Sequence, residues 1–309
     1  MTAWLALLLP SLAWAVSAER ASTAGSFLKL PAGARAVAMG EAYAAAPSGS
    51  DALFWNPAAL SRGTSGARHA AAFSHAEYLE ESSLEQASYG LSGPWGGAGI
   101  GLRYLSVGKL VETDETGAQT GTFSPSDYCL SLGLGRTLGQ GAMFLEGFSA
   151  GMAAKYLESR VLDTARTWAV DLAVLSPAYL GRRLSLAAVL RNLGGDLEFE
   201  SDSEELPLEG RLGAAWRHGR AWLVTLDLAV PRDDDPFAGL GAEYSWSSGK
   251  GWSLAGRAGF NSRTVGDVRG FSGADFGLGF GWGSFGFDYA FQPMGSLGSP
   301  HHFTLTTSF

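Results

Sequence analysis

The feature that most constrains this chain is an alternation of apolar with small or polar residues, repeated from about residue 66 to the end. In the segment 275–282, Phe276, Leu278, Phe280 and Trp282 alternate with aspartate and glycine. A period of two residues is typical of β-strands whose two faces lie in different environments. Beyond residue 18, no apolar run approaches the roughly twenty residues that a membrane-spanning helix requires. The sequence therefore predicts an all-β protein.

The alternating segments number about fourteen, and turn residues separate them. They are predicted at 66–78, 83–92, 97–111, 122–136, 145–159, 165–176, 183–198, 207–217, 221–231, 237–247, 251–261, 271–282, 284–292 and 301–309. An even number of antiparallel strands of about this length is typical of bacterial outer-membrane barrels. We therefore predict one antiparallel transmembrane β-barrel over residues 66–309.

A secreted soluble sandwich also alternates, so the composition of the less apolar face has to decide between the two folds. That face consists of glycine, alanine and serine with isolated charges, whereas a solvated outer face would be mostly charged. The charged residues assigned to it are Arg103, Lys155, Asp171, Arg191, Arg211, Asp227, Glu243, Arg257, Asp275 and Asp288. Small residues with scattered charges suit the crowded lumen of a barrel, and we predict that these side chains face the lumen.

Tryptophans and loop charges predict how the barrel is oriented. Trp95, Trp216, Trp222, Trp246, Trp252 and Trp282 all fall beside connections that follow even-numbered strands. Tryptophan gathers at membrane interfaces, so these positions predict an aromatic girdle. The same connections are short and mildly basic, whereas those after odd-numbered strands are mostly longer and acidic. Periplasmic turns and extracellular loops differ in this way, so we expect both chain ends on the periplasmic side of an outer membrane.

Both ends of the chain carry features of export and assembly. Residues 1–18 have the pattern of a signal peptide, with an apolar run and then small residues before Glu19. At the other end Phe303, Leu305 and Phe309 share one face of the last strand. A terminal Phe resembles the signal that barrel-assembly machinery recognises, so this machinery and outer-membrane lipid are expected partners. The single cysteine, Cys129, excludes an internal disulfide.

Composition and spacing argue against several functions. The net charge is −8 and no basic cluster stands out, which speaks against nucleic acid as a partner. The five histidines lack partners at metal or catalytic-triad spacing. His301 and His302 are adjacent on a predicted strand and therefore point to opposite faces. We expect no enzymatic activity, no metal and no cofactor.

Residues 19–65 do not alternate and form a separate segment ahead of the barrel. Small residues dominate 33–44, and Asn56 is placed to cap a helix that begins with Pro57. The runs 27–30 (FLKL), 33–40 (GARAVAMG) and 55–60 (WNPAAL) resemble the PorV/PorQ group of outer-membrane proteins, which is related to the FadL long-chain fatty-acid transporters.

The resemblance implies a fourteen-stranded barrel whose N-terminal segment, with short helices, folds into the lumen as a hatch. The residues that match the motif are Arg35, Gly40, Trp55, Asn56, Pro57 and Ala58. Lumen charges would then be able to pair with hatch groups such as Arg35, Glu41 and Asp51. Plain structural packing is an equally good interpretation of each of these residues.

Three hypotheses of function are open, two of them implied by the resemblance and the third favoured by the small inward-facing residues. The first is a FadL-like transporter or channel for hydrophobic small molecules, although the acidic loops lack an apolar patch that would gather such a ligand. The second is an accessory component of a type IX-like secretion or surface-attachment pathway, which would bind exported proteins. The third is a structural barrel that conducts nothing. We place transport first and secretion second.

The third predicted strand contains a break in the alternation. Its apolar phase shifts from Tyr104 to Leu105, which a β-bulge near residues 103–105 would explain. In FadL-like transporters an early strand is kinked where the wall opens. An ordinary bulge is the preferred interpretation, and an opening is the alternative.

Overall fold

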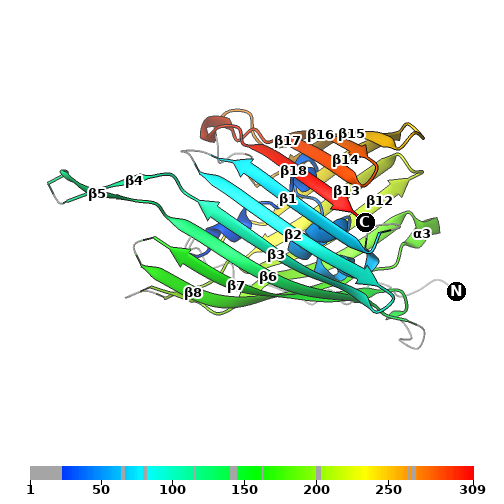
Figure 1. Ribbon diagram of the computed structural model, residues 1–309, viewed down its shortest axis with the longest axis horizontal. Helices are drawn as coiled ribbons and strands as arrows, with labels where there is room; N and C mark the ends of the chain where they lie inside the picture. The colour runs from blue at the N-terminus through cyan, green and yellow to red at the C-terminus, as the bar shows by residue number, and fades with distance from the viewer. Residues whose placement is uncertain are drawn as a thin grey trace.

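The computed structural model describes residues 23–63, 67–78, 82–114, 116–139, 145–161, 163–199, 203–263, 265 and 269–309. Its dominant feature is a closed antiparallel barrel (Figure 1). The signal peptide predicted at residues 1–18 lies outside the described residues. Among the described residues, no helix is long and apolar enough to cross a bilayer.

Fourteen strands form the barrel wall, which confirms the predicted fold class. They are β1 (His69–Glu77), β2 (Ser83–Gly93), β3 (Gly96–Ser106), β6 (Ser126–Thr137), β7 (Ser149–Arg160), β8 (Thr164–Leu175), β9 (Leu184–Gly194), β12 (Glu209–His218), β13 (Trp222–Pro231), β14 (Phe237–Ser247), β15 (Trp252–Asn261), β16 (Ala274–Trp282), β17 (Phe285–Phe291) and β18 (His301–Ser308). Each strand pairs with its neighbours along the chain, and β1 pairs with β18 to close the ring. Closure leaves the barrel without an unpaired edge strand.

Two small hairpins lie outside the ring. β4 (Leu110–Thr113) pairs with β5 (Gln119–Phe123), and this hairpin projects beyond one end of the barrel (Figure 1). β10 (Leu197–Glu198) pairs with β11 (Ser203–Glu204) in the connection from β9 to β12. The strands predicted at 97–111, 122–136 and 183–198 are therefore too long, because each prediction joins a wall strand to part of an adjoining hairpin.

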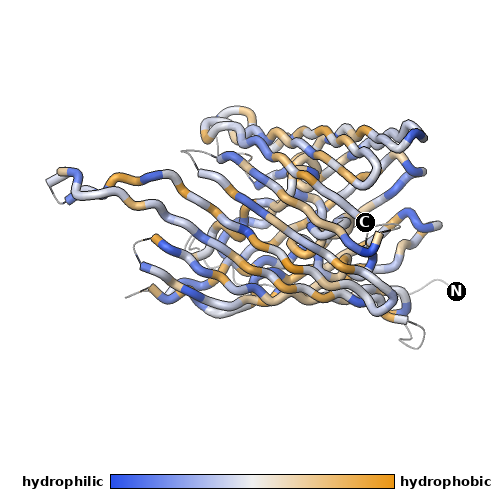
Figure 2. The backbone as a smooth tube through the Cα atoms, viewed as in Figure 1, coloured by the Kyte–Doolittle hydropathy of each residue, from blue (hydrophilic) through white to orange (hydrophobic). Residues whose placement is uncertain are grey.

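The outer face of the wall is apolar between two levels of aromatic residues, and the hydropathy alternates along the strands (Figure 2). The girdle tryptophans lie at the end with short turns, where Trp246 packs on Trp252 at 4.9 Å between ring centroids. At the other level, Tyr128, Tyr156 and Trp168 form a row across three adjacent strands, with ring centroids 5.0 and 6.1 Å apart. Aromatic rings at two levels are what a lipid-facing barrel presents.

The N-terminal segment, residues 23–63, lies inside the barrel and is called the hatch below. It contains η1 (Ser26–Lys29), α1 (Ala34–Ala38), η2 (Gly49–Asp51), α2 (Ala52–Trp55) and η3 (Pro57–Arg62). α1 packs against β15–β18, whereas η3 packs against β2, β3 and β6–β8 on the other side. The hatch therefore reaches across the lumen. Two short helical turns, α3 (Tyr179–Arg182) and η5 (Gly295–Leu297), lie in connections between wall strands.

The core of the molecule lies between the hatch and the wall. One apolar cluster joins Met39, Leu53, Phe54, Trp55 and Leu60 of the hatch to alanine, valine and leucine residues of the wall. A second lies nearer the end with the hairpins and includes Phe27, Leu28, Leu157 and Leu197. Small wall residues let the hatch backbone approach closely, and this explains why the inward face is so rich in glycine and alanine.

The bulge considered for residues 103–105 is absent. β3 pairs with β2 and β6 without a register shift through this region. Leu105 lies on the same inward face as Arg103 and packs against the second apolar cluster, so the apparent phase break marks an apolar level of the lumen. The wall is irregular instead between β8 and β9, where Arg191 and Asn192 both turn inward opposite Asp171.

Candidate functional site: the hatch and its contacts with the wall

The motif around Trp55 and Asn56 holds the hatch together from within. Both side chains are buried. The Trp55 ring nitrogen donates to the Ala32 carbonyl at 2.8 Å. Asn56 accepts a hydrogen bond from the Ala58 N–H at 3.0 Å and donates one to the Ala44 carbonyl at 2.8 Å. Asn56 is thus both the predicted helix cap, with Pro57 at the first position of η3, and a tie between two turns of the hatch.

Gly40 lies where the hatch meets the wall at closest range. Its φ of 62° is in the left-handed region, and a Cβ there would lie 2.4 Å from the Phe260 carbonyl oxygen. On the wall, a Cβ at Gly259 would lie 2.0 Å from the Gly40 nitrogen. The two glycines therefore face each other across a contact that admits no side chain.

Arg35 joins the hatch to a network of charges on the wall. Its guanidinium makes two hydrogen bonds of 2.8 Å to the two carboxylate oxygens of Glu243. Arg257 bonds Glu243 at 2.6 Å and Asp288 at 2.6 Å. Two arginines thus balance two carboxylates at the lumen wall, in the arrangement that makes buried charge tolerable.

A second group of charges receives the turn after Gly40. Asp227 accepts hydrogen bonds from the backbone N–H groups of Tyr43 at 3.0 Å and Ala44 at 2.9 Å. Arg211 donates to the Glu41 carbonyl at 2.7 Å and to Glu209 at 3.0 Å. The hatch backbone is therefore satisfied by wall side chains where it has no secondary structure of its own.

The remaining predicted lumen charges differ in what they contact. Arg103 donates to the carbonyls of Phe27, Leu28 and Leu30. Lys155 pairs with Asp171 at 2.6 Å, and Arg191 lies over the Trp55 ring at 5.3 Å. Asp275 is buried, and one of its carboxylate oxygens has no partner. All ten predicted side chains lie on the inward face of the wall, and five of them, Arg103, Arg191, Arg211, Asp227 and Glu243, contact the hatch directly.

Several contacts to the hatch come from residues that the alternation did not single out. Gln86 accepts a hydrogen bond from the Gly33 N–H, and Thr304 accepts one from the Ala34 N–H. Arg263 reaches Glu41 at 3.5 Å, and Asp233 binds Lys29. Gln86 and Thr304 are inward-facing but uncharged, and Asp233 and Arg263 lie in loops. The sequence analysis considered charged residues on strands, and it therefore missed these four residues.

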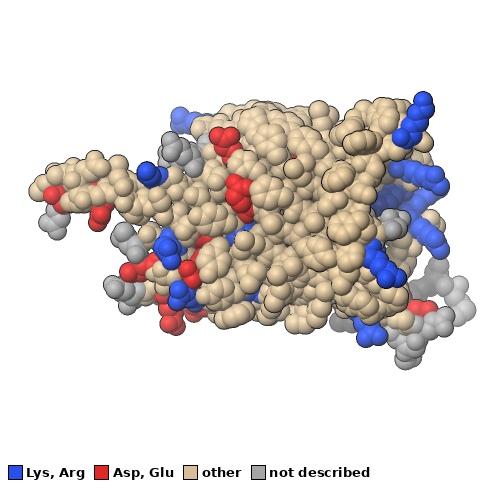
Figure 3. Space-filling view, in the orientation of Figure 1, with Lys and Arg blue, Asp and Glu red and all other residues tan. Residues whose placement is uncertain are grey.

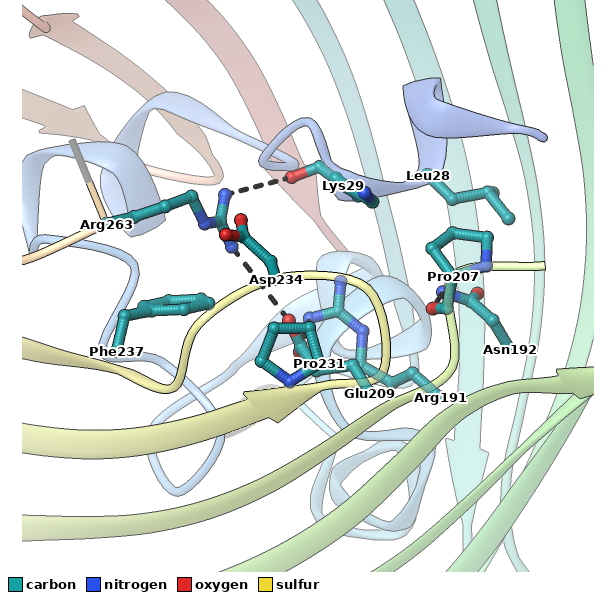
Figure 4. A pocket seen from close by; sticks show the side chains of 10 residues that line it. All are labelled: Leu28, Lys29, Arg191, Asn192, Pro207, Glu209, Pro231, Asp234, Phe237 and Arg263. Atoms are coloured by element: carbon teal, nitrogen blue, oxygen red, sulfur yellow. Dashed lines mark hydrogen bonds and ion pairs between the residues drawn. The ribbon is translucent and has the colours of Figure 1, made fainter. Parts of the chain in front are cut away.

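At the end with the hairpins, little open space remains between the hatch and the wall. Figure 4 shows the cavity there, where Arg263 reaches toward the Lys29 carbonyl and toward Glu209. Its volume is about 10 Å³, room for about one water molecule. Phe237 lies under the Arg263 guanidinium, 4.0 Å from it. This end of the lumen is closed by paired charges rather than by apolar contacts alone.

A cavity inside the barrel and a groove outside it meet at the same part of β1 and β18. On the inside, a cavity of about 140 Å³ lies beside Arg35, Tyr43 and Asp51 of the hatch. On the outside, an apolar groove of about 460 Å³ lies between aromatic and aliphatic side chains of β1 and β16–β18. The cavity and the groove share four lining residues, Ala71, Ala72, Thr306 and Thr307. These four residues, called the seam below, all have small side chains.

The predicted assembly signal lies on the outer face of β18, next to the seam. Phe303, Leu305 and Phe309 are exposed, by 37%, 58% and 64% of their surface. Phe309 closes the end of the β1–β18 ladder through backbone hydrogen bonds with His69. Among the described residues, no group of three or more His, Cys, Asp or Glu is arranged to hold a metal ion.

Comparisons with known proteins relate this chain to others by fold. No model of a known family matches it, and no curated protein matches it. The toluene transporter TodX of Pseudomonas putida aligns with a TM-score of 0.54 at 14% identity, covering 89% of this chain and 96% of TodX. A mutant of TodX described as a monoaromatic hydrocarbon channel aligns with a TM-score of 0.54 at 13% identity, covering 90% of this chain and 99% of the mutant. These likenesses show a shared fold.

Proposed function

We propose that this chain is an outer-membrane channel for hydrophobic small molecules. The observation that carries the proposal is the seam, where small residues separate an internal cavity from an apolar groove on the outer wall. The free energy of a hydrophobic molecule falls when it leaves a polar cavity for such a groove, whereas the free energy of an ion or a sugar rises. The seam therefore offers a path with the right selectivity.

Opening the seam near its end would involve only part of the ladder between β1 and β18. The cavity lies beside residues 70–72 and 304–308, where β1 begins and β18 ends. Strand ends open locally at lower cost than the middle of a sheet. The described hatch contacts the wall on both sides of the lumen, which favours this lateral path over a straight aqueous one.

Localisation, orientation and family belong to the same proposal. The apolar outer belt and two aromatic levels support insertion in an outer membrane, and the basic turns support a periplasmic end with both termini. The PorV/PorQ resemblance rests on the N-terminal motif together with the strand number and the terminal Phe. The fold shared with TodX supports the wider FadL relationship. The secretion hypothesis stays a prediction without a described surface that favours it.

The direct test is uptake by cells that carry the chain in their outer membrane and lack their own hydrophobic transporters. Radiolabelled toluene and radiolabelled oleate serve as hydrophobic probes, and radiolabelled sucrose serves as the hydrophilic control. The proposal predicts faster uptake of at least one hydrophobic probe and unchanged uptake of sucrose. Unchanged uptake of both hydrophobic probes would favour a structural barrel, and faster sucrose uptake would indicate an open aqueous pore.

A further inference from the structure

The end of the barrel with short turns carries a ring of exposed basic side chains, called the basic rim below. Its members are Arg68, Arg136, Arg182, Arg183, Arg220 and Lys250. Figure 3 shows mostly positive side chains at this end, and negative side chains mixed with positive ones toward the other. None of the six forms an ion pair with a carboxylate of the described residues. Within the described residues, the rim is therefore a concentration of positive charge without carboxylate partners.

The rim lies directly beyond the tryptophan girdle. Arg220 lies in the turn between the strands that carry Trp216 and Trp222, and Lys250 lies between Trp246 and Trp252. Trp216, Trp222 and Trp246 are exposed by 43–49% on the outer face. Tryptophan marks the level of lipid headgroups, so the basic side chains next to it lie at the depth of phosphate groups.

The turn between β8 and β9 adds an apolar tip to the rim. Leu180, Gly181 and Arg182 have φ values of 51°, 70° and 68°, a conformation that costs free energy for leucine and arginine. The Arg183 N–H closes this turn by donating to the Tyr179 carbonyl at 2.8 Å. As a result Leu180 is 73% exposed between two arginines and a tyrosine. An exposed apolar tip beside basic residues is typical of a segment that enters the interfacial region of a bilayer.

We infer that the basic rim binds the headgroups of anionic glycerophospholipids in the leaflet next to the short turns. Charge complementarity and continuity with the apolar belt favour a lipid over a soluble acidic partner. The inference rests on the membrane location and orientation in the proposed function. It adds a lipid class that would anchor and orient the barrel, whatever molecule the barrel transports.

The test is native mass spectrometry of the full chain released from detergent with phosphatidylglycerol, phosphatidylcholine or lipopolysaccharide. The variant Arg182→Gln/Arg183→Gln/Arg220→Gln removes three rim charges. The matched control Lys109→Gln/Arg160→Gln/Arg269→Gln removes three exposed charges near the opposite end. We expect the unaltered chain to prefer phosphatidylglycerol over phosphatidylcholine. Each lost rim charge should weaken this preference about fivefold, or about a hundredfold for three, whereas the control should keep it.

Three outcomes would overturn the inference: no preference for phosphatidylglycerol in the unaltered chain, equal loss in both triple variants, or a rim-dependent preference for lipopolysaccharide. The heat-dependent gel mobility of folded barrels shows that each variant has folded. Lipid binding is measured separately from uptake, so the lipid inference can be wrong while the transport proposal is right, and the transport proposal can be wrong while the lipid inference is right.

As a second measurement, an environment-sensitive dye on Leu180→Cys should emit at shorter wavelength in phosphatidylglycerol discs than in detergent. An unchanged spectrum would contradict insertion of the tip.

Discussion

Single residues hold the hatch in place mainly through backbone groups. Asp227, Arg211 and Arg103 all bind N–H or carbonyl groups of the hatch, and Asn56 ties two of its turns together. Such contacts satisfy a segment that has little regular structure, because each buried backbone group needs a partner. The hatch is therefore specified by where wall side chains point rather than by its own helices.

Asp51 should make hatch docking depend on pH. Burial raises the pKa of its carboxyl from 3.8 to about 6, and the exposed part of the side chain faces the internal cavity. A raised pKa means that the docked hatch holds the proton more firmly than a released one. The resulting stability is present below about pH 4 and is lost as the pH rises to about 6.

Hydrogen exchange of hatch peptides, corrected for intrinsic rates, measures this effect. Protection at about pH 4 should exceed protection at about pH 7 in the unaltered chain. Asp51→Asn, which is neutral throughout, should remove the difference and keep the higher protection. Ser61→Ala, a change at a partly buried hydroxyl of the same segment, should leave the difference intact. A pH dependence that survives in Asp51→Asn would assign it to another group.

At the scale of elements, glycines on the wall strands let the hatch approach. On β15, Gly259 faces the hatch at a distance that leaves no room for a Cβ, whereas Gly256 has open space around it. Gly259→Ala should destabilise the docked hatch by about 1–3 kcal/mol, because the obstacle is backbone and cannot turn aside. The open fraction would then rise by roughly five- to a hundredfold.

Ion conductance in planar bilayers measures that fraction, since a displaced hatch opens an aqueous path. Gly256→Ala, on the same strand but without a nearby atom, is the matched control and should conduct like the unaltered chain. Equal conductance of both variants would show that close packing at Gly259 does not keep the lumen closed.

The strands could be predicted from sequence because each carries its own alternation, and the lumen charges followed from the same period. The wall strand β3 and the hairpin strand β4 could not be separated, since the turn between them is short and both segments are apolar. Leu105 wrongly indicated a β-bulge, because its apolar side chain faces inward and packs against a buried apolar cluster of the lumen. Contacts such as Gln86 with Gly33 depend on how the hatch folds, and no local pattern encodes them.

At the scale of the whole molecule, the barrel combines a hatch inside its lumen with a seam of small residues between an inner cavity and an outer groove. The hatch contacts both sides of the lumen, and the seam lies where the first and last strands meet. The remaining wall can stay paired while this end of the ladder opens. If the proposed route is correct, transport should depend on separating β1 from β18 and on no other pair of strands.

A disulfide across the seam tests this dependence directly. Ala71 and Thr307 are register partners on the outer face, so Ala71→Cys/Thr307→Cys would lock the end of the ladder when oxidised. Ala150 and Val174 are register partners near the same end of β7 and β8, so Ala150→Cys/Val174→Cys is the matched control. The native Cys129 is buried, and the unaltered chain reports any effect of the oxidant itself.

The decisive measurement is uptake of the radiolabelled hydrophobic probe by oxidised and then reduced cells. The account predicts that oxidation of the seam pair stops uptake, that reduction restores it, and that the control pair transports in both states. Undiminished uptake through an oxidised seam would contradict the lateral route.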